Sequence, residues 1–115
     1  MRTGGIQPGS RVLIHLSGPP EQFWGILDDL SPAGVTFRGL NVGSFEDFMA
    51  QAARDDEPAL GFSTMFVPMF RVERIYLDEQ VGMVRSYGQR FEARVGRSVE
   101  SYLMRPGDAD DTPPS

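Results

Sequence analysis

The sequence predicts a mainly β domain, a small closed barrel of five strands with one inserted α-helix and one C-terminal α-helix. Two observations carry this prediction. Short segments of alternating apolar and polar residues are separated by turns rich in Pro and Gly, as in antiparallel sheets. Two other segments repeat their apolar residues every three or four positions, the period of a helix. The 115 residues are the usual length of one domain.

The strands are expected where apolar residues recur at every second position. Val12, Ile14 and Leu16 show this alternation in the first strand, and a Ser-Gly-Pro-Pro turn follows them. A change of phase in the last strand predicts a β-bulge near Glu73 and Arg74. The predicted strands are Arg11–Leu16, Gln22–Leu30, Gly34–Leu40, Ser63–Val67 and Arg71–Leu77.

Two helices are expected, each with one apolar face. In Phe45–Arg54 the apolar residues fall at i, i+3, i+4 and i+7. We expect this face to cover the barrel or, alternatively, to contact another subunit. Ser86–Leu103 has the same spacing, although Gly96 weakens it by about 1 kcal/mol relative to Ala. The predicted organisation is a flexible lead at 1–10, the barrel at 11–80 with its helix at 45–54, a helix at 86–104 and a disordered tail at 105–115.

Composition narrows the classes of function. The formal net charge is −5, but without the three aspartates of residues 107–115, 11 basic residues face 13 acidic ones, a net charge of −2. A nearly neutral domain argues against indiscriminate binding to duplex nucleic acid, which needs a strong positive field. The absence of cysteine excludes disulfides, zinc–thiolate sites and thiol nucleophiles.

No apolar run is long enough to span a membrane, and the first residues lack a secretory signal, so a cytoplasmic protein without membrane contact is expected. Neither His15 nor the carboxylate pair Asp28 and Asp29 has a catalytic or metal-ligating partner that the sequence identifies. The sequence therefore predicts no catalytic residues, no metal, no cofactor and no enzymatic activity.

The apolar side chains exceed what the inside of a small barrel holds, because both faces of several strands are apolar. The surplus must lie beneath the two helices or in an interface between copies. We therefore expect a non-catalytic binding or assembly module that forms homo-oligomers. The candidate interface residues are Trp24, Phe45, Phe48, Met49, Phe66, Tyr87 and Phe91.

The strand and turn pattern of Arg11–Leu77 resembles the Sm-like family of small five-stranded barrels, and Src-homology-3-type barrels share much of it. Gly25 and Leu27 match the spacing of the family's first motif, within a bent second strand. Its nucleobase-contacting turn positions hold Ser31 and Val35 here. The second motif is matched in part, because its basic turn is replaced; its aliphatic positions correspond to Val67, Val72 and Ile75, and its turn to Pro68-Met69.

Because members of the Sm-like family form rings and often bind RNA, the resemblance implies an alternative function as an RNA-binding regulator. Arginines could hold the phosphates of RNA, and a stripe of them follows the C-terminal helix. A solvated, charge-balanced helix face is the other reading of that stripe. The candidate RNA-binding residues are Arg38, Arg71, Arg74, Arg90, Arg94 and Arg97.

A shorter segment, Asp29-Leu30-Ser31-Pro32-Ala33-Gly34, is similar to the Asp-x-Ser-x-x-Gly turn of the PilZ family. That resemblance implies a second alternative, a receptor for cyclic diguanylate. The family also uses an upstream Arg-x-x-x-Arg, whereas this sequence has only Arg2 and Arg11 upstream of the turn. An ordinary hairpin turn accounts for the same six residues.

Overall fold

A computed structural model describes residues 5–54 and 62–103, with the side chains of residues 102 and 103 excepted. Its centre is one antiparallel sheet of five strands in the order β4-β3-β2-β1-β5. All five predicted strands are present, with ends that shift by at most one residue. They are β1 (Arg11–Leu16), β2 (Glu21–Ser31), β3 (Gly34–Asn41), β4 (Ser63–Pro68) and β5 (Val72–Leu77).

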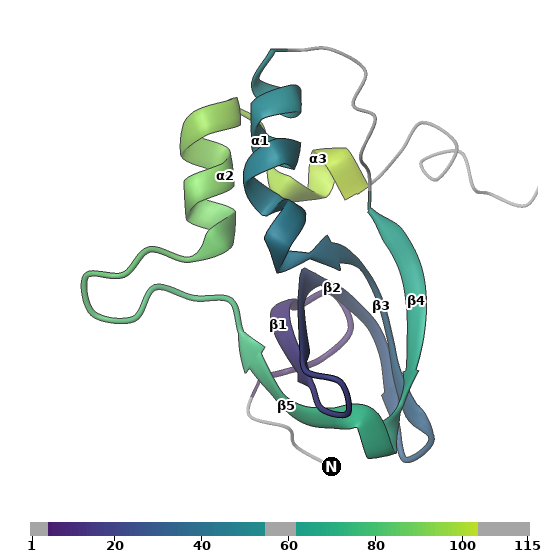
Figure 1. The fold of residues 1–115 in the computed structure, drawn as a ribbon. Coiled ribbons are helices and arrows are strands. Elements are labelled where there is room, and N and C mark those ends of the chain that lie inside the picture. The colour runs from purple at the N-terminus through teal and green to yellow at the C-terminus, as the bar shows by residue number, and fades with distance from the viewer. Residues whose placement is uncertain (1–4, 55–61, 104–115) are drawn as a thin grey trace, which may run out of the picture.

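The helices lie together at one end of the sheet (Figure 1). The inserted helix α1 (Phe45–Ala53) follows a short 3₁₀ turn, η1 (Val42–Ser44), and packs beside α2 (Tyr87–Val95). A second 3₁₀ turn, η2 (Met69–Arg71), connects β4 to β5. No helix in the described part of the chain combines the length and the apolar character needed to span a membrane.

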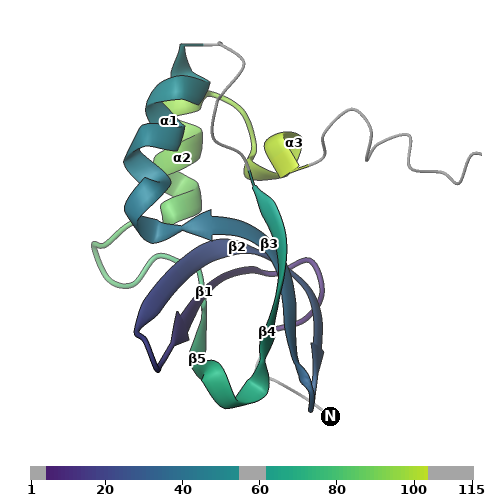
Figure 2. The ribbon, with the colours of Figure 1, turned by 45° about the vertical axis from the view of Figure 1, so that its right-hand side comes forward.

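The sheet curls strongly, as Figure 2 shows, but the described strand pairings do not include one between β4 and β5. The mainly β, five-stranded prediction is therefore confirmed, whereas closure into a barrel is not. Backbone hydrogen bonds hold η2 under the sheet: the Met69 N–H donates to Ala33 O (3.0 Å), and Arg71 O accepts from the Ser17 N–H (2.8 Å).

The predicted β-bulge is confirmed. His15 pairs with Arg74 and Leu16 pairs with Val72, so Glu73 is the extra residue of β5. Because of this extra residue, Val72 and Ile75 both pack against the inner side of the sheet although they are three positions apart.

Gly25 and Gly39 pair across β2 and β3 where the two strands lie unusually close. A Cβ atom on Gly25 would lie 2.7 Å from the Cα of Gly39, and a Cβ on Gly39 would lie 2.9 Å from the Cα of Gly25. Any side chain at either position would therefore force the strands apart. Gly25, which matches the glycine of the Sm-like motif, is therefore required here because the two strands lie so close together.

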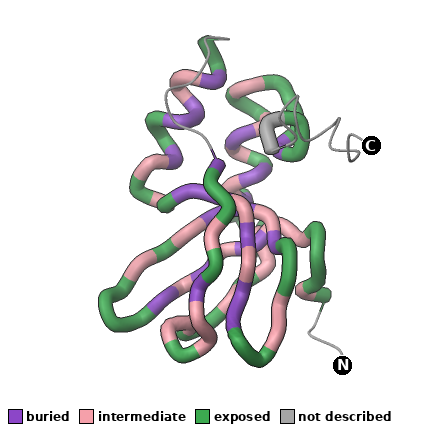
Figure 3. Tube along the Cα trace, turned by 90° about the vertical axis from the view of Figure 1, so that its right-hand side faces the viewer, coloured by how far each residue is buried: buried purple, intermediate pink, exposed green. Residues whose placement is uncertain are grey.

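The buried side chains form two cores on opposite faces of the sheet, and Figure 3 shows buried residues along the strands and in the helices. We call the first the inner core, because it lies within the curl. Its buried residues are Val12, Ile14, Leu16, Leu27, Val35, Phe37 and Val67. We call the second the outer core, because it lies between the sheet and the helices. Its buried residues are Trp24, Leu40, Phe45, Phe48, Met49, Ala52, Phe62, Phe91 and Val99.

The outer core shows where most of the surplus apolar residues lie: beneath the helices, which is the first of the two places expected for them. Five of the seven candidate interface residues are buried here at 3% exposure or less, against other parts of their own chain. They are Trp24, Phe45, Phe48, Met49 and Phe91. Of the two arrangements considered for the apolar face of α1, packing against its own sheet is the one observed. Tyr87 is half-buried at the edge of this core, and Phe66 is exposed.

The predicted single helix at 86–104 is wrong, because α2 ends at Val95 and a separate short helix, α3, spans Val99–Leu103. Gly96 ends α2 in the left-handed conformation, with φ of 81°, and its N–H donates to Glu92 O (2.9 Å). This turn brings Val99 into the outer core.

The described part of the predicted flexible lead pairs with β2. The Gly9 N–H donates to Leu27 O (2.8 Å), and the Leu27 N–H donates to Ser10 O (2.9 Å). Residues 1–4, residue 104 and the predicted disordered tail at 105–115 lie outside the described residues.

Candidate binding surfaces

A groove of about 700 Å³ opens beside η2, where the curled sheet is not closed. We call it the mouth groove. Its wall combines the N-terminal lead, the end of β2 with the following turn, η2 and β5. Seven of its eleven lining residues are apolar, and two acids, Asp29 and Glu73, are among the rest. The lining residues are Ile6, Gln7, Pro8, Asp29, Leu30, Ser31, Pro32, Met69, Val72, Glu73 and Ile75.

The PilZ-like turn contributes Asp29 and Ser31 to this groove, but the hydrogen bond of the Ser31 side chain stabilises the turn itself. The Ser31 hydroxyl oxygen accepts from the Ala33 N–H (3.2 Å). Of the two upstream arginines, Arg2 lies outside the described residues, and Arg11 is held by Glu92 and Glu100. Binding of cyclic diguanylate stays a prediction.

A smaller groove of about 380 Å³ lies beside the β1–β2 turn. It contains His15, whose ring makes an edge-to-face contact with Tyr76, with ring centres 4.9 Å apart. The groove contains two carboxylates and two carboxamides, which are the polar groups near His15 that a ligand would meet. They belong to Glu21, Glu73, Gln22 and Asn41.

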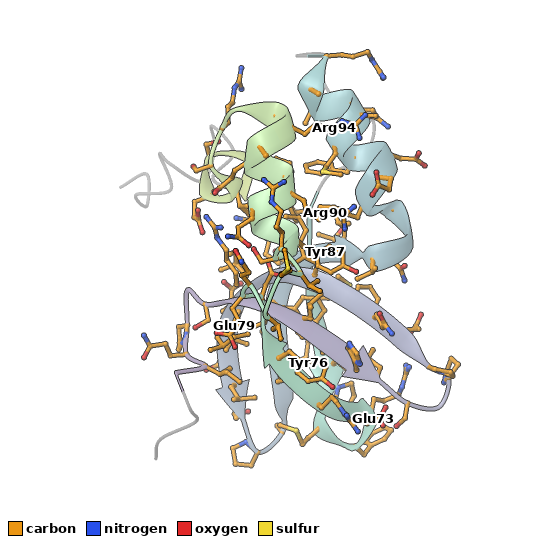
Figure 4. The ribbon with its side chains drawn as sticks, turned by 90° about the vertical axis from the view of Figure 1, so that its left-hand side faces the viewer. Glu73, Tyr76, Glu79, Tyr87, Arg90 and Arg94 are labelled. Carbon is orange, nitrogen blue, oxygen red and sulfur yellow. The ribbon has the colours of Figure 1, made fainter. Side chains whose placement is uncertain are left out.

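The arginine stripe of α2 is neutralised in part by α1. Arg90 pairs with Glu46, and Arg94 lies 3.6 Å from the same carboxylate. The Arg90 guanidinium also lies over two aromatic rings, 5.1 Å from the centre of Phe45 and 5.5 Å from that of Tyr87. Figure 4 shows Arg90 and Arg94 along α2, above Tyr87. These contacts attach α2 to α1, which matches the reading of a charge-balanced helix face.

The other arginines proposed for RNA contact do not gather with this stripe. Arg71, the last residue of η2, donates to two backbone carbonyl oxygens, Ser17 O (2.8 Å) and Pro19 O (2.7 Å), and so ties η2 to the β1–β2 turn. Arg74 donates to the Tyr76 hydroxyl (3.0 Å) on the exposed face of β5. Arg38 is half-buried on β3, and Arg97 is exposed between α2 and α3. RNA binding stays a prediction that these contacts do not favour.

An ion-pair cluster joins β1 to α2 and α3, and no local sequence pattern indicates it. Arg11 donates two hydrogen bonds to Glu100 (2.9 and 2.7 Å) and one to Glu92 (2.7 Å). The hydrogen bonds that Arg11 donates lower the pKa of Glu100, and accepting them lets Glu100 raise the pKa of Arg11 further above its ordinary value. This cluster holds α3 against the sheet.

Asp78 joins the outer core to the start of α2. Its carboxylate accepts from the indole N–H of Trp24 (3.0 Å) and from the backbone N–H groups of Tyr87 and Gly88 (2.8 Å each). Ser86 adds a capping box with Gln89 at the same helix end. The negative charge of Asp78 also lies at the positive end of the helix dipole, so Asp78 both caps and anchors α2.

Exposed apolar side chains gather in two places. Phe66 and Phe70, on β4 and η2, are 56% and 84% exposed. The second place is Val81–Val84, a turn between β5 and α2 that we call the apolar hairpin. Val81 and Val84 exchange backbone hydrogen bonds of 2.9 Å, and Gly82 adopts a positive φ of 60°.

Comparison with known protein families, with curated proteins and with solved structures gives no match to this chain. Its function is therefore inferred from its geometry.

Proposed function

We propose that this protein is a binding and assembly module without catalytic activity, whose copies associate with one another. The carrying observation is the apolar surface that the chain leaves uncovered after its two cores are filled. Met83, Phe70 and Val84 are 96%, 84% and 71% exposed. Apolar side chains of this size, gathered at two places on a small acidic protein, are typical of contact surfaces.

The order of the strands supports a barrel of Sm-like type as the assembling unit. In the order β4-β3-β2-β1-β5, each strand pairs with its neighbour in the chain, except that β5 returns to β1. This is the order of a five-stranded barrel opened between β4 and β5. Each of those two edge strands has one side that is unpaired among the described strands, so an edge could accept a strand from another copy.

The test is native mass spectrometry of the purified full chain, together with sedimentation over about 1 to 500 µM. We expect masses at multiples of 12.8 kDa, with a population that grows with concentration. A single protomer at every concentration would refute the proposal. A mass increment that nuclease removes would instead support the RNA-binding alternative.

A further inference from the structure

The apolar hairpin is a preformed protrusion. Its two backbone hydrogen bonds fix the turn, and Gln80 supports it by donating to Gly82 O (3.0 Å) and accepting from Gln89 (3.0 Å). Figure 1 shows the segment between β5 and α2 projecting from the side of the molecule. Because the hairpin is already ordered, little conformational entropy remains to be lost when it binds. Its most exposed residue is Met83, whose flexible apolar side chain suits insertion into an irregular pocket.

The mouth groove has the complementary character. Leu30, Met69, Val72 and Ile75 give it apolar walls, and its volume of about 700 Å³ falls within the range of pockets that enclose a small ligand. That space is sufficient for a few apolar side chains. The hairpin contributes no residue to the groove, and η2, which lines the groove, precedes β5, whereas the hairpin follows the other end of β5. A hairpin could therefore enter the groove only from a second copy.

The charges beside the two features are also complementary. Arg85 directly follows the hairpin, and it makes no hydrogen bond or ion pair with any described residue. Asp29 lies at the groove, and its side chain likewise makes no hydrogen bond or ion pair with a described residue. The other acid of the groove, Glu73, already pairs with Arg74 at 3.4 Å. The apolar hairpin is thus flanked by a positive charge, and the apolar mouth groove is flanked by a negative one, so that the two surfaces are electrostatically complementary.

We propose that the apolar hairpin of one copy inserts into the mouth groove of the next copy, with Met83 in the groove and Arg85 paired with Asp29. This inference rests on the proposed function, because it names the two surfaces through which the copies associate. The contact is heterologous, so each copy in a pair keeps one free hairpin or one free groove. Repetition of the contact would close a ring or extend a filament.

Two variants of the full chain test the proposal. Met83→Glu places a charge on the hairpin and leaves the groove intact, whereas Met69→Glu places a charge in the groove and leaves the hairpin intact. We expect each variant to self-associate about tenfold more weakly or worse in sedimentation experiments. Ala93→Glu, which adds the same charge at an exposed position of α2, is the control and should associate as the natural chain does.

Mixing the two variants gives the decisive result. The intact groove of Met83→Glu should accept the intact hairpin of Met69→Glu, so the mixture should form a one-to-one pair and nothing larger. If Met69→Glu fails to fold by circular dichroism, Asp29→Arg replaces it, since Asp29 is exposed.

Association that persists in both variants, or a mixture that forms no pair, would overturn the inference while leaving self-assembly intact. If Phe70→Glu abolishes association and Met83→Glu does not, the inference is also overturned, and the contact between copies involves η2 instead. A natural chain that never associates would refute the proposed function as well.

Discussion

The inner and outer cores of this protein are built from different side chains and closed in different ways. The inner core is mainly aliphatic, and its buried residues come from strands, where they alternate with outward-facing ones. The outer core is mainly aromatic: Trp24 has its ring centre within 5.1–6.3 Å of those of Phe45, Phe62, Tyr87 and Phe91. Helices seal the outer core, whereas the inner core stays open at the mouth groove.

The difference shows how a small sheet can bury apolar residues on both of its faces. Curling covers one face without additional chain, but it leaves an opening wherever the edge strands fail to pair. Helices cover one end of the other face, and they need polar anchors to hold their position. Asp78 and Arg11 provide those anchors on the outer side. We therefore expect the outer core to dominate stability and the inner core to supply the site where a partner binds.

The strongest test of this comparison is Trp24→Ala. The substitution removes the ring at the centre of the outer core and leaves the Asp78 carboxylate without its indole donor. We expect a loss of about 3–5 kcal/mol in the free energy of unfolding, as for other large aromatic truncations. Urea unfolding followed by far-UV circular dichroism measures it. A loss below about 1 kcal/mol would mean that the outer core is not the main source of stability.

A smaller effect is expected from Asp78→Asn, which keeps the shape of the side chain. The amide nitrogen would face backbone or indole N–H groups that now donate to a carboxylate oxygen. We expect a loss of about 1–3 kcal/mol in urea unfolding. The matched control is Glu79→Gln at the neighbouring exposed acid, which should change stability by less than about 0.5 kcal/mol. Equal effects of the two substitutions would contradict the anchoring role of Asp78.

The smallest effect concerns Glu100 and depends on pH. Its pKa in the folded protein is lowered, chiefly by the hydrogen bonds from Arg11. The stabilisation is therefore complete above the ordinary glutamate pKa of about 4.3 and is lost as the pH falls through the lowered folded value. Because Glu100 is half exposed and screened by solvent, we expect less than about 1 kcal/mol.

Urea unfolding at pH 6 and pH 3 measures this effect against Glu100→Gln. The natural chain should be slightly more stable than the variant at pH 6, and the difference should shrink at pH 3. A difference that grows on acidification would have the wrong sign for a carboxylate stabilised by Arg11.

The strands, the bulge and the inserted helix could be predicted because their signals are local. Alternation of apolar and polar residues, ended by Pro- and Gly-rich turns, locates each strand to within a few residues. The extra residue of β5 shifts this alternation by one position and is therefore visible in the sequence. The division of the C-terminal segment into α2 and α3 could not be predicted. A Gly in a helical pattern can lie within a continuous helix or can end the helix in the left-handed conformation, and the sequence pattern does not distinguish the two. Gly96 adopts it here, together with the docking of Val99 and Glu100 on the outer side.

The anchors of the outer core could not be predicted, because their partners are distant in sequence. Trp24 and Asp78 are 54 positions apart, and Arg11 and Glu100 are 89 positions apart. An apolar helix face shows that Phe48 and Phe91 need a cover, but it does not tell whether that cover is the same chain or another. The mouth groove was also missed, since it depends on which strand edges stay unpaired.

The left-handed turn at Gly96 sets the minimal length of the folding unit. A polypeptide truncated after Val95 would retain every strand and both long helices, yet it would lack Val99 and Glu100. The beginning of β1 would then keep only Glu92 opposite Arg11, and a hole would open beside Phe91. Libraries of shortened variants should therefore show a sharp drop in soluble yield once the boundary passes residue 99, before any regular element of the sheet is removed.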